Sequence, residues 1–432
     1  MPQFLSAQDA DFESRFAALL GMKREEAEDV DQAVAAIIAR VRAEGDAALV
    51  DLTRRFDRYA GPLVFSADEI AAACAKVSDE DRVAMELAAA RIRAYHERQR
   101  PEDAVWVDAA GASLGWRWTP VSVAGLYVPG GLASYPSSVL MNAIPARVAG
   151  VERLVIACPT PDGVVNPLVL LAAQIAGVEV IYRVGGAQAI AALAYGTETI
   201  AAVDKITGPG NAWVAAAKRR VFGRVGIDMI AGPSEILVIA DRDNNPDWIA
   251  LDLLSQAEHD ESAQAILITD DAGFGSAVAE AVSRRLETLQ RRAIAGASWA
   301  RNGAVIVVRS LDEAADLSNR VAPEHLQLCV ADPEALAKRI KHAGAIFLGA
   351  WTPEAIGDYV GGPNHVLPTA RSARFSSGLS VMDFVKRTTI ARMTPEALAL
   401  IGPAAERLAI SESLQAHALS VRARLDALNR GR

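Results

Sequence analysis

The sequence has few residues of the kinds that mark secreted, membrane or nucleic-acid-binding proteins. Only three of its 432 residues are cysteines, and Cys74, Cys158 and Cys329 form no C-x-x-C pair, so we expect reduced, buried thiols. It has no apolar run long enough to cross a membrane and no basic segment leading into an apolar one at its start. The net charge of −9 argues against a nucleic-acid surface. We therefore expect a cytoplasmic protein.

Histidine is also scarce. The chain has only six, and four of them, His259, His325, His365 and His417, lie in short polar stretches. Imidazole is the usual side chain for a metal ligand or for a base near neutral pH. The concentration of scarce histidines in polar stretches therefore indicates an enzyme that uses a metal, a base or both.

The pattern of apolar residues predicts an α/β protein with helical ends. Apolar residues at helical spacing predict helices over 29–55 and 81–98. From residue 121, β-branched runs alternate with helical segments, which predicts mostly parallel sheets covered by helices. The last fifty residues, from Phe384, again read as helix. The predicted strands are 121–128, 153–157, 179–184, 204–207, 235–240, 265–269, 304–308 and 345–348.

Three of the predicted strand-to-helix junctions are rich in glycine. They read YVPGG (127–131), RVGGAQ (183–188) and ITGPGNA (206–212). Glycine lets a ligand approach the backbone, and a following helix offers free N–H groups to an anion. None is a G-x-G-x-x-G or a P-loop, and each alone is more often an ordinary tight turn. Together they favour a nucleotide-like site at the carboxyl edge of a sheet.

The stretch SQAEHD ends a predicted helix that starts near Asn245 and has Trp248, Leu251 and Leu254 as its expected core stripe. Another face carries Asp252, Gln256 and His259 at positions i, i+4 and i+7. An oxygen ligand and a histidine one turn apart can share a divalent metal, although an exposed polar face is the simpler interpretation. Helix spacing alone favours Asp252 or Glu258 over the neutral amide of Gln256 as the oxygen ligand.

Three further polar stretches each carry a histidine. In RVAPEHLQL, Glu324 and His325 are adjacent and can share a site only where the backbone is irregular or an element begins. Pro323 makes this plausible because it biases the preceding residue away from helix. The second stretch is the glycine- and proline-rich loop IGDYVGGPNHVLPT, and the third is the terminal SESLQAH. Each stretch also has a simpler interpretation. The first could be the acidic start of a surface helix, the second a rigid turn, and the third a solvated terminal helix.

Read together, these stretches resemble the histidinol dehydrogenase family. The matching motifs run in order from residue 125 to residue 417, which makes the resemblance specific although each motif alone is weak. They are GLYVPGG, YPSSVLMNAIPA, VGGAQAIAALAYGTE, KITGPGNAWV, DMIAGPSEILVIAD, SQAEHD, APEHL, GDYVGGPNHVLPT, SSGLSVMDF and ESLQAH.

The resemblance implies an activity: the NAD-linked, four-electron oxidation of L-histidinol to L-histidine through L-histidinal, with one zinc ion per subunit. It implies that Glu324 and His325 transfer protons, and it places His365 in the pocket without a defined role. The implied zinc ligands are Gln256, His259, Asp358 and His417. The implied NAD contacts are Tyr127, Gln188 and Asn211. The implied substrate contacts are Ser234, Gln256, His259, His325, Asp358, Glu412 and His417.

The resemblance also implies two incomplete Rossmann-like domains in an intertwined homodimer, in which the C-terminal segment completes the partner's site. We expect a helical arm over 1–25, a first α/β domain over 26–125 and 235–380 that holds the metal and catalytic residues, a second over 126–234 on the NAD side, and a helical segment over 381–432. One departure is Ser413, where the family commonly has glycine after the glutamate that matches Glu412. If this position needs a positive φ, serine would strain the backbone.

Other functions remain open at this point. A relative with the same zinc and NAD chemistry could oxidise another alcohol, such as a sulfonated diol, although Glu412 favours a substrate with an amino or imidazole group. A zinc hydrolase is disfavoured by the glycine-rich junctions and by the lack of an H-E-x-x-H motif. A catalytically inactive binding protein is disfavoured because every chemical residue of the family is present. Manganese could occupy the same ligands.

Overall fold

The computed structural model describes residues 2–22, 28–130, 135–230 and 232–430. By their contacts these residues form two units. The first contains residues 1–99 and 122–384, and the second contains residues 100–121 and 385–432. Each unit is described by itself below. No helix in the described ranges is long and apolar enough to cross a membrane, and all three cysteines are free and buried, as predicted.

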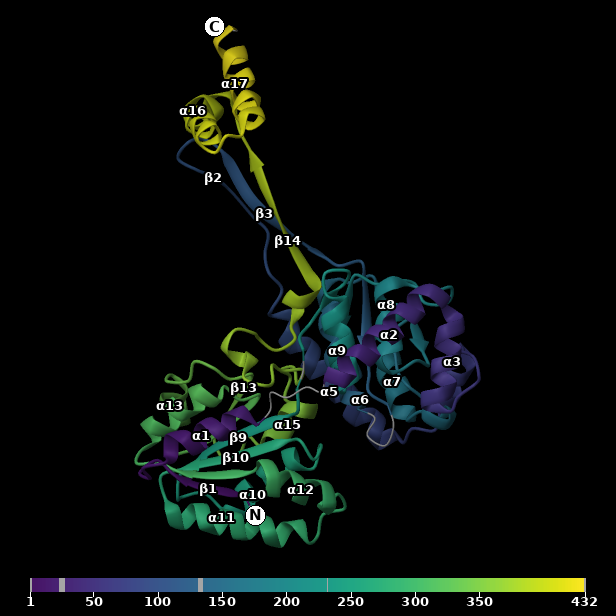
Figure 1. Ribbon diagram of the computed structural model, residues 1–432, viewed down its shortest axis with the longest axis vertical. Helices are drawn as coiled ribbons and strands as arrows, with labels where there is room; N and C mark the ends of the chain where they lie inside the picture. Colours follow the sequence, from purple (N-terminus) through teal and green to yellow (C-terminus); the bar gives the residue numbers. More distant parts are fainter. Residues whose placement is uncertain (1, 23–27, 131–134, 231, 431–432) are drawn as a thin grey trace. The chain divides into compact units, whose positions relative to one another are not determined.

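The first unit contains a six-stranded sheet in which every pairing is parallel (Figure 1). Its central strands are buried along their whole length, so apolar side chains project from both of their faces. In spatial order the strands are β1 (Gln3–Ser6), β11 (Ala304–Val307), β10 (Gln264–Thr269), β9 (Glu235–Ala240), β12 (His325–Cys329) and β13 (Ala345–Leu348).

Helices cover both faces of this sheet. On one face, α10 (Pro246–Ala257), α11 (Ala272–Leu286) and α12 (Arg292–Asn302) bury their apolar sides against Ile236, Leu267 and Val305. On the other, α1 (Phe12–Gly21) and α13 (Leu311–Val321) pack against side chains of the same strands. The short helices α14 (Pro333–Ala337) and α15 (Glu354–Tyr359) follow β12 and β13. The layers agree with the predicted α/β class.

The first unit also contains a five-stranded parallel sheet. Its strand order is β6 (Val180–Tyr182), β5 (Arg153–Ala157), β4 (Val123–Tyr127), β7 (Lys205–Thr207) and β8 (Gly226–Ile227). The chain moves outward from β4 through β5 to β6, then returns to the other side of β4 for β7. This reversal is a topological switch point, where open α/β sheets bind ligands at their carboxyl edge.

Helices again form the connections between the strands of this sheet. The helices α6 (Pro136–Ala149) and α7 (Pro167–Ile175) connect β4, β5 and β6, and α8 (Gly186–Tyr195) and α9 (Ala212–Val221) connect β6, β7 and β8. Near the N-terminus of the unit lie α2 (Glu28–Glu44), α3 (Asp46–Asp57), α4 (Ala67–Cys74) and α5 (Asp79–Glu97).

The packing differs from the predicted domain limits in two places. Residues 3–6 do not belong to a purely helical arm, because β1 pairs with β11 as an edge strand of the six-stranded sheet. The helices α2 and α3 do not join that sheet either; Val34, Ile38 and Leu49 share a core with the five-stranded sheet. An apolar helix face specifies burial but not which sheet buries it. The limit at residues 25 and 26 lies outside the described residues.

The second unit joins two distant parts of the chain. An antiparallel sheet has β3 (Ser113–Pro120) between β2 (Ala104–Val107) and β14 (Val385–Arg392), and two helices follow, α16 (Pro395–Ser411) and α17 (Gln415–Arg430). The prediction of helix from Phe384 onward is therefore wrong for 385–392. This stretch pairs along its full length with β3, a partner more than 250 residues away that local sequence does not reveal.

Ser413 lies in the turn between α16 and α17 and has a φ of 61°. The left-handed conformation costs an L-residue about 1–2 kcal/mol, and glycine avoids most of that cost. Position 413 therefore has the positive φ at which serine is expected to strain the backbone.

We expect Ser413→Gly to stabilise this turn by roughly 0.5–1 kcal/mol, the left-handed cost less the extra chain entropy of glycine. Hydrogen–deuterium exchange of the peptide that spans residues 408–418 should slow by a few fold. The control is Ala423→Gly, in the exposed interior of α17, which should speed exchange there because glycine costs about 1 kcal/mol in a helix. If hydrogen–deuterium exchange around this turn were faster in Ser413→Gly than in the wild type, serine would not be straining the turn.

Candidate active site

Glu324 and His325 lie where an irregular connection enters β12. The helix α13 ends at Val321, and Ala322 has a φ of 48°, in the left-handed region. His325 is the first residue of β12, so the two adjacent side chains need not follow helical spacing. Both residues are buried, with 6% and 5% of their surface exposed. The sequence condition for a shared site, an irregular backbone at the start of an element, is met here.

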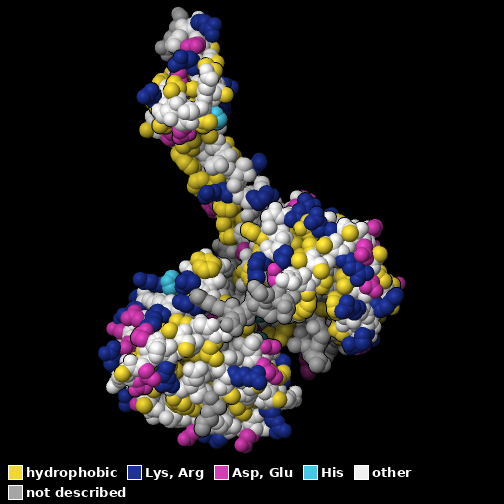
Figure 2. Space-filling view, in the orientation of Figure 1, with side chains coloured by type: hydrophobic (Ala, Val, Ile, Leu, Met, Phe, Trp, Pro, Cys, Tyr) yellow, Lys and Arg dark blue, Asp and Glu magenta, His cyan; other side chains and the backbone are white. Residues whose placement is uncertain are grey.

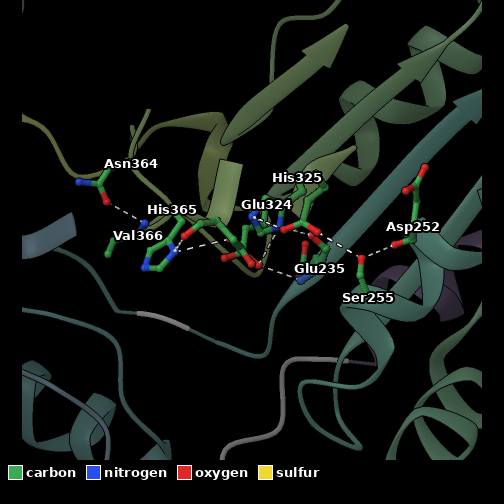
Figure 3. Close-up of polar contacts among 10 residues, drawn as sticks. Glu235, Asp252, Ser255, Glu324, His325, Asn364, His365 and Val366 are labelled. Carbon is green, nitrogen blue, oxygen red and sulfur yellow. Dashed lines mark hydrogen bonds and ion pairs between the residues drawn. The ribbon is translucent and has the colours of Figure 1, made fainter. Parts of the chain in front are cut away.

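The main chain of Glu235 contacts both of these side chains (Figure 3). Its N–H donates to Oε2 of Glu324 at 2.8 Å, and its carbonyl oxygen lies 3.0 Å from Nδ1 of His325. A carbonyl oxygen can only accept, so the proton of a neutral His325 ring lies on Nδ1. The other ring nitrogen, Nε2, is then the basic one. Among the described residues this buried nitrogen has no hydrogen-bond partner.

Burial lowers the pKa of His325, because taking a charged imidazolium out of water is unfavourable; the carboxylate of Asp358 partly offsets this. The lowered pKa keeps His325 neutral near pH 7. A neutral imidazole with a free, buried nitrogen is suited to accept a proton from a bound alcohol.

The end of α10 supplies two more of the predicted site residues. The side chain of Asn245 caps the helix by accepting the N–H of Asp247 at 2.9 Å. Gln256 is 1% exposed, and its Oε1 has no partner among the described residues. His259 follows the helix, and its ring is stacked with that of Tyr135 at 6.3 Å. A buried amide oxygen without a hydrogen-bond partner costs folding free energy unless a ligand binds to it.

Asp252, one of the two carboxylates that helix spacing favoured as the oxygen ligand, is bonded to another side chain. Its Oδ2 accepts a hydrogen bond from Nε2 of Gln327 at 2.7 Å, and burial raises its pKa to about 6. Only part of the expected core stripe of this helix faces inward: Leu254 is buried, as predicted. Trp248 and Leu251 are 43% and 41% exposed, whereas the buried residues include Leu253 and Gln256.

The helix α15 and the loop after it carry Asp358 and His365. Nδ1 of His365 donates to the main-chain oxygen of Asp358 at 3.1 Å and lies 3.6 Å from its Oδ1. Burial alone raises the pKa of Asp358, but the hydrogen bond with His365 and the nearby imidazoles lower it overall. Nε2 of His365 accepts the hydroxyl of Ser138 at 3.2 Å. His365 therefore connects the Asp358 segment to α6.

Glu354 is a buried acid that sequence reasoning missed. It is 2% exposed, its Oε1 lies 3.6 Å from Nε2 of His325, and Ser255 donates to its Oε2 at 3.3 Å. Burial raises its pKa, and the adjacent Asp358 carboxylate raises it further. In sequence Glu354 is an ordinary acidic residue in the first turn of a short helix, so no local signal marked it.

Two sets of donors could hold a metal at this point. Donor atoms of His325, Glu354 and Asp358 lie within 4.8 Å of one another. The set implied by the family resemblance shares only Asp358 with this group and adds Gln256, His259 and His417. The unpartnered Oε1 of Gln256 favours the second set, since amide, imidazole and carboxylate donors together fit zinc.

The predicted NAD contacts meet at the switch point of the five-stranded sheet. The hydroxyl of Tyr127 accepts a hydrogen bond from the N–H of Gly186 at 3.1 Å, which joins the end of β4 to the start of α8. Asn211 caps α9, with its Oδ1 accepting two main-chain N–H groups at 3.1 and 3.2 Å. Gln188 lies in the first turn of α8 and is 2% exposed. Gly131, the last residue of the first glycine-rich stretch, lies outside the described residues.

The remaining predicted site residues differ in location. Ser234 is half-buried and directly precedes the Glu235 main chain that contacts the catalytic pair. Glu412 and His417 are exposed on the second unit, at the end of α16 and the start of α17. Their part in the site stays a prediction.

Comparison with known proteins decides the family. The family model described as histidinol dehydrogenase matches residues 21–425. The chain belongs to the histidinol dehydrogenase family. It is 77% identical to the histidinol dehydrogenase of Cereibacter sphaeroides over 100% of both chains, and 64% identical to that of Rhodospirillum rubrum, again over the full length of both. The crystal structure of the Elizabethkingia anophelis histidinol dehydrogenase matches with a TM-score of 0.94 and 38% identity, over 99% of each chain. The chain is therefore an oxidoreductase with this family's fold.

The two ligand sets predict opposite outcomes for two variants. We expect His259→Ala to weaken zinc binding at least about tenfold, because it removes a donor, and Glu354→Gln to change it less than about threefold. Zinc content after dialysis against a graded chelator measures both. His259→Gln serves as a control for the size of the side chain. Loss of zinc from Glu354→Gln with retention in His259→Ala would assign the metal to His325, Glu354 and Asp358.

Proposed function

We propose that the protein catalyses the zinc-dependent, NAD-linked oxidation of L-histidinol to L-histidine through L-histidinal, the last steps of histidine biosynthesis. The relatives named above are histidinol dehydrogenases along their full length. The observation that carries the proposal is the pairing of Glu324 and His325 on the main chain of Glu235. This arrangement leaves one free basic nitrogen and one held carboxylate in the same buried site, which suits two successive proton transfers.

The two side chains have different tasks in this reaction. Nε2 of His325 takes the hydroxyl proton of the alcohol as hydride leaves for NAD, while Nδ1 stays bonded to Glu235. The aldehyde must then add water before a second hydride can leave. Glu324 activates that water, with its Oε2 fixed by the N–H of Glu235. The four-electron oxidation would consume two NAD for each histidinol.

Gln256, His259 and Asp358, with His417, would hold the zinc. When bound, zinc supplies a positive charge that attracts the amino and imidazole nitrogens of the substrate. A neutral amide among the ligands leaves more of that charge available than a second carboxylate would. The unpartnered Oε1 of Gln256 supports this assignment. Manganese could occupy the same nitrogen and oxygen donors.

The substrate and NAD would be held by residues of several elements. Tyr127, Gln188 and Asn211 would contact NAD at the carboxyl edge of the five-stranded sheet. Ser234, His325 and the zinc ligands would contact histidinol, and Glu412 would hold its amino or imidazole group. A sulfonated diol, the substrate of the rival assignment, has no positive group for Glu412.

The first test mixes purified, zinc-loaded protein with NAD and L-histidinol and follows NADH absorbance. We expect two NADH for each histidinol, because the reaction removes four electrons. Activity should be lost on chelation and return with zinc. Absence of NADH from the zinc-loaded protein would refute the histidinol assignment, and charged diols would then be tested as substrates.

We further propose a homodimer in which the segment over 381–432 completes the partner's site. Exposed apolar side chains support a partner for the second unit, and Figure 2 shows hydrophobic side chains along its surface. They include Val105, Trp106, Val107, Leu400, Leu408, Leu414 and Leu419, which are 42–69% exposed. Apolar exposure of this extent commonly marks an interaction surface.

Mixed dimers test this arrangement. A Glu324→Gln subunit and a His417→Ala subunit are each expected to be inactive alone. If the terminal segment serves the partner, one site of a mixed dimer has neither mutation, so unfolding and refolding the two together should restore about a quarter of wild-type activity under random assortment. A mixture of a single variant with itself is the control. No recovery in a folded, mixed dimer would count against the shared site.

A further inference from the structure

Lys218 and Asp228 form a buried ion pair in the first unit. Lys218 lies in α9, Asp228 follows β8, and their side chains are 3% and 0% exposed. Removing two charges from water is costly, and such a pair is often no more stabilising than apolar side chains of similar size. The proposed reaction does not use either group. The pair is therefore expected to have a role in specifying local structure.

Both charges act on the same peptide segment. Nζ of Lys218 donates to the carbonyl oxygen of Gly208 at 3.1 Å, and the N–H of Gly208 donates to Oδ2 of Asp228 at 2.8 Å. Gly208 has a φ of +113°, and a Cβ there would lie 2.1 Å from the main-chain oxygen of Tyr127. The ion pair thus holds Gly208 directly against the end of β4, where no other residue type fits.

The position of Gly208 matters because it begins the loop that leads to Asn211. The far end of this loop is fixed by the two hydrogen bonds through which Asn211 caps α9. The near end is fixed by Lys218 and Asp228. The loop connects β7 to α9 beside β4, at the switch point of the sheet.

We propose that Lys218 and Asp228 are positioning residues for the dinucleotide, which hold the Gly208–Asn211 loop in its binding conformation. The inference rests on the proposed NAD site at this edge. Neither side chain is exposed, so the pair acts through the loop. A loop that is ordered before binding loses less entropy on binding, so the pair raises affinity for the dinucleotide without taking part in the chemistry.

The test is the double variant Lys218→Met/Asp228→Asn in the zinc-loaded protein. It removes both charges together, so no lone buried charge remains, and the introduced amide keeps an acceptor for the N–H of Gly208. We expect the KM for NAD to rise about tenfold, with kcat at saturating NAD within about twofold. Zinc content and the KM for histidinol should not change. Asp228→Asn alone keeps the acceptor but leaves the buried charge of Lys218 without its partner, so its KM for NAD should rise at least as much as that of the double variant.

Arg220→Met is the matched control. Arg220 is also in α9, but it pairs with Asp31 and not with Gly208, and the two side chains are 37% and 44% exposed. We expect its KM for NAD to stay within about twofold of wild type, since exposed pairs contribute little.

Direct titration with NADH, followed by its fluorescence, separates the two proposals. If wild type binds NADH but does not oxidise histidinol, the proposed function fails while the effect on the loop can still be measured. An unchanged NADH affinity in the double variant or in Asp228→Asn would overturn the inference. The inference would also be overturned if both variants lost kcat, zinc content and melting temperature as much as they lost affinity for NADH. A general structural role would produce that result.

Discussion

The candidate active site depends on two hydrogen bonds to the peptide groups of Glu235. This residue begins β9, a strand held between β10 and β12, so its N–H and carbonyl cannot turn. The side chains of Glu324 and His325 form hydrogen bonds with these fixed groups, which orient both side chains. The same bonds decide which nitrogen of His325 carries the proton, so strand pairing sets the site's acid–base properties.

The candidate active site lies at the amino ends of strands in the six-stranded sheet, and the proposed dinucleotide site lies at the carboxyl ends of strands in the five-stranded sheet. Glu235 and His325 stand at the amino ends of their strands, whereas Tyr127 and Gly208 stand at the carboxyl end of the five-stranded sheet. The loop that follows Asp358 joins the two regions: Asn364 donates to the main-chain oxygen of Met141 at 2.5 Å, and His365 bonds to Ser138. Both contacts are on α6, which follows β4.

Much of the fold was predictable because buried parallel strands are short, continuous apolar runs. The predicted strands correspond to β4, β5, β6, β7, β9, β10, β11 and β13. The strands β1, β2, β3, β8, β12 and β14 were not predicted. The strand β12 begins at His325, directly after Glu324, and β1 and β14 depend on partners distant in sequence. Local propensity is weak where tertiary pairing supplies the stabilisation.

The order of residues along the chain was enough to specify the α/β class, the polar stretches that hold the scarce histidines and, through ten ordered motifs, the family. Helix spacing alone favoured Asp252 or Glu258 as the oxygen ligand, and only the resemblance to the family pointed to Gln256. The folded chain places Gln327 against Asp252 and leaves Gln256 buried without a partner among the described residues, which favours Gln256 in the proposed site. Likewise, only packing revealed Glu354 and the main chain of Glu235. Spacing along the chain specifies which side chains can meet, but burial and competing partners decide which remain free to bind a ligand.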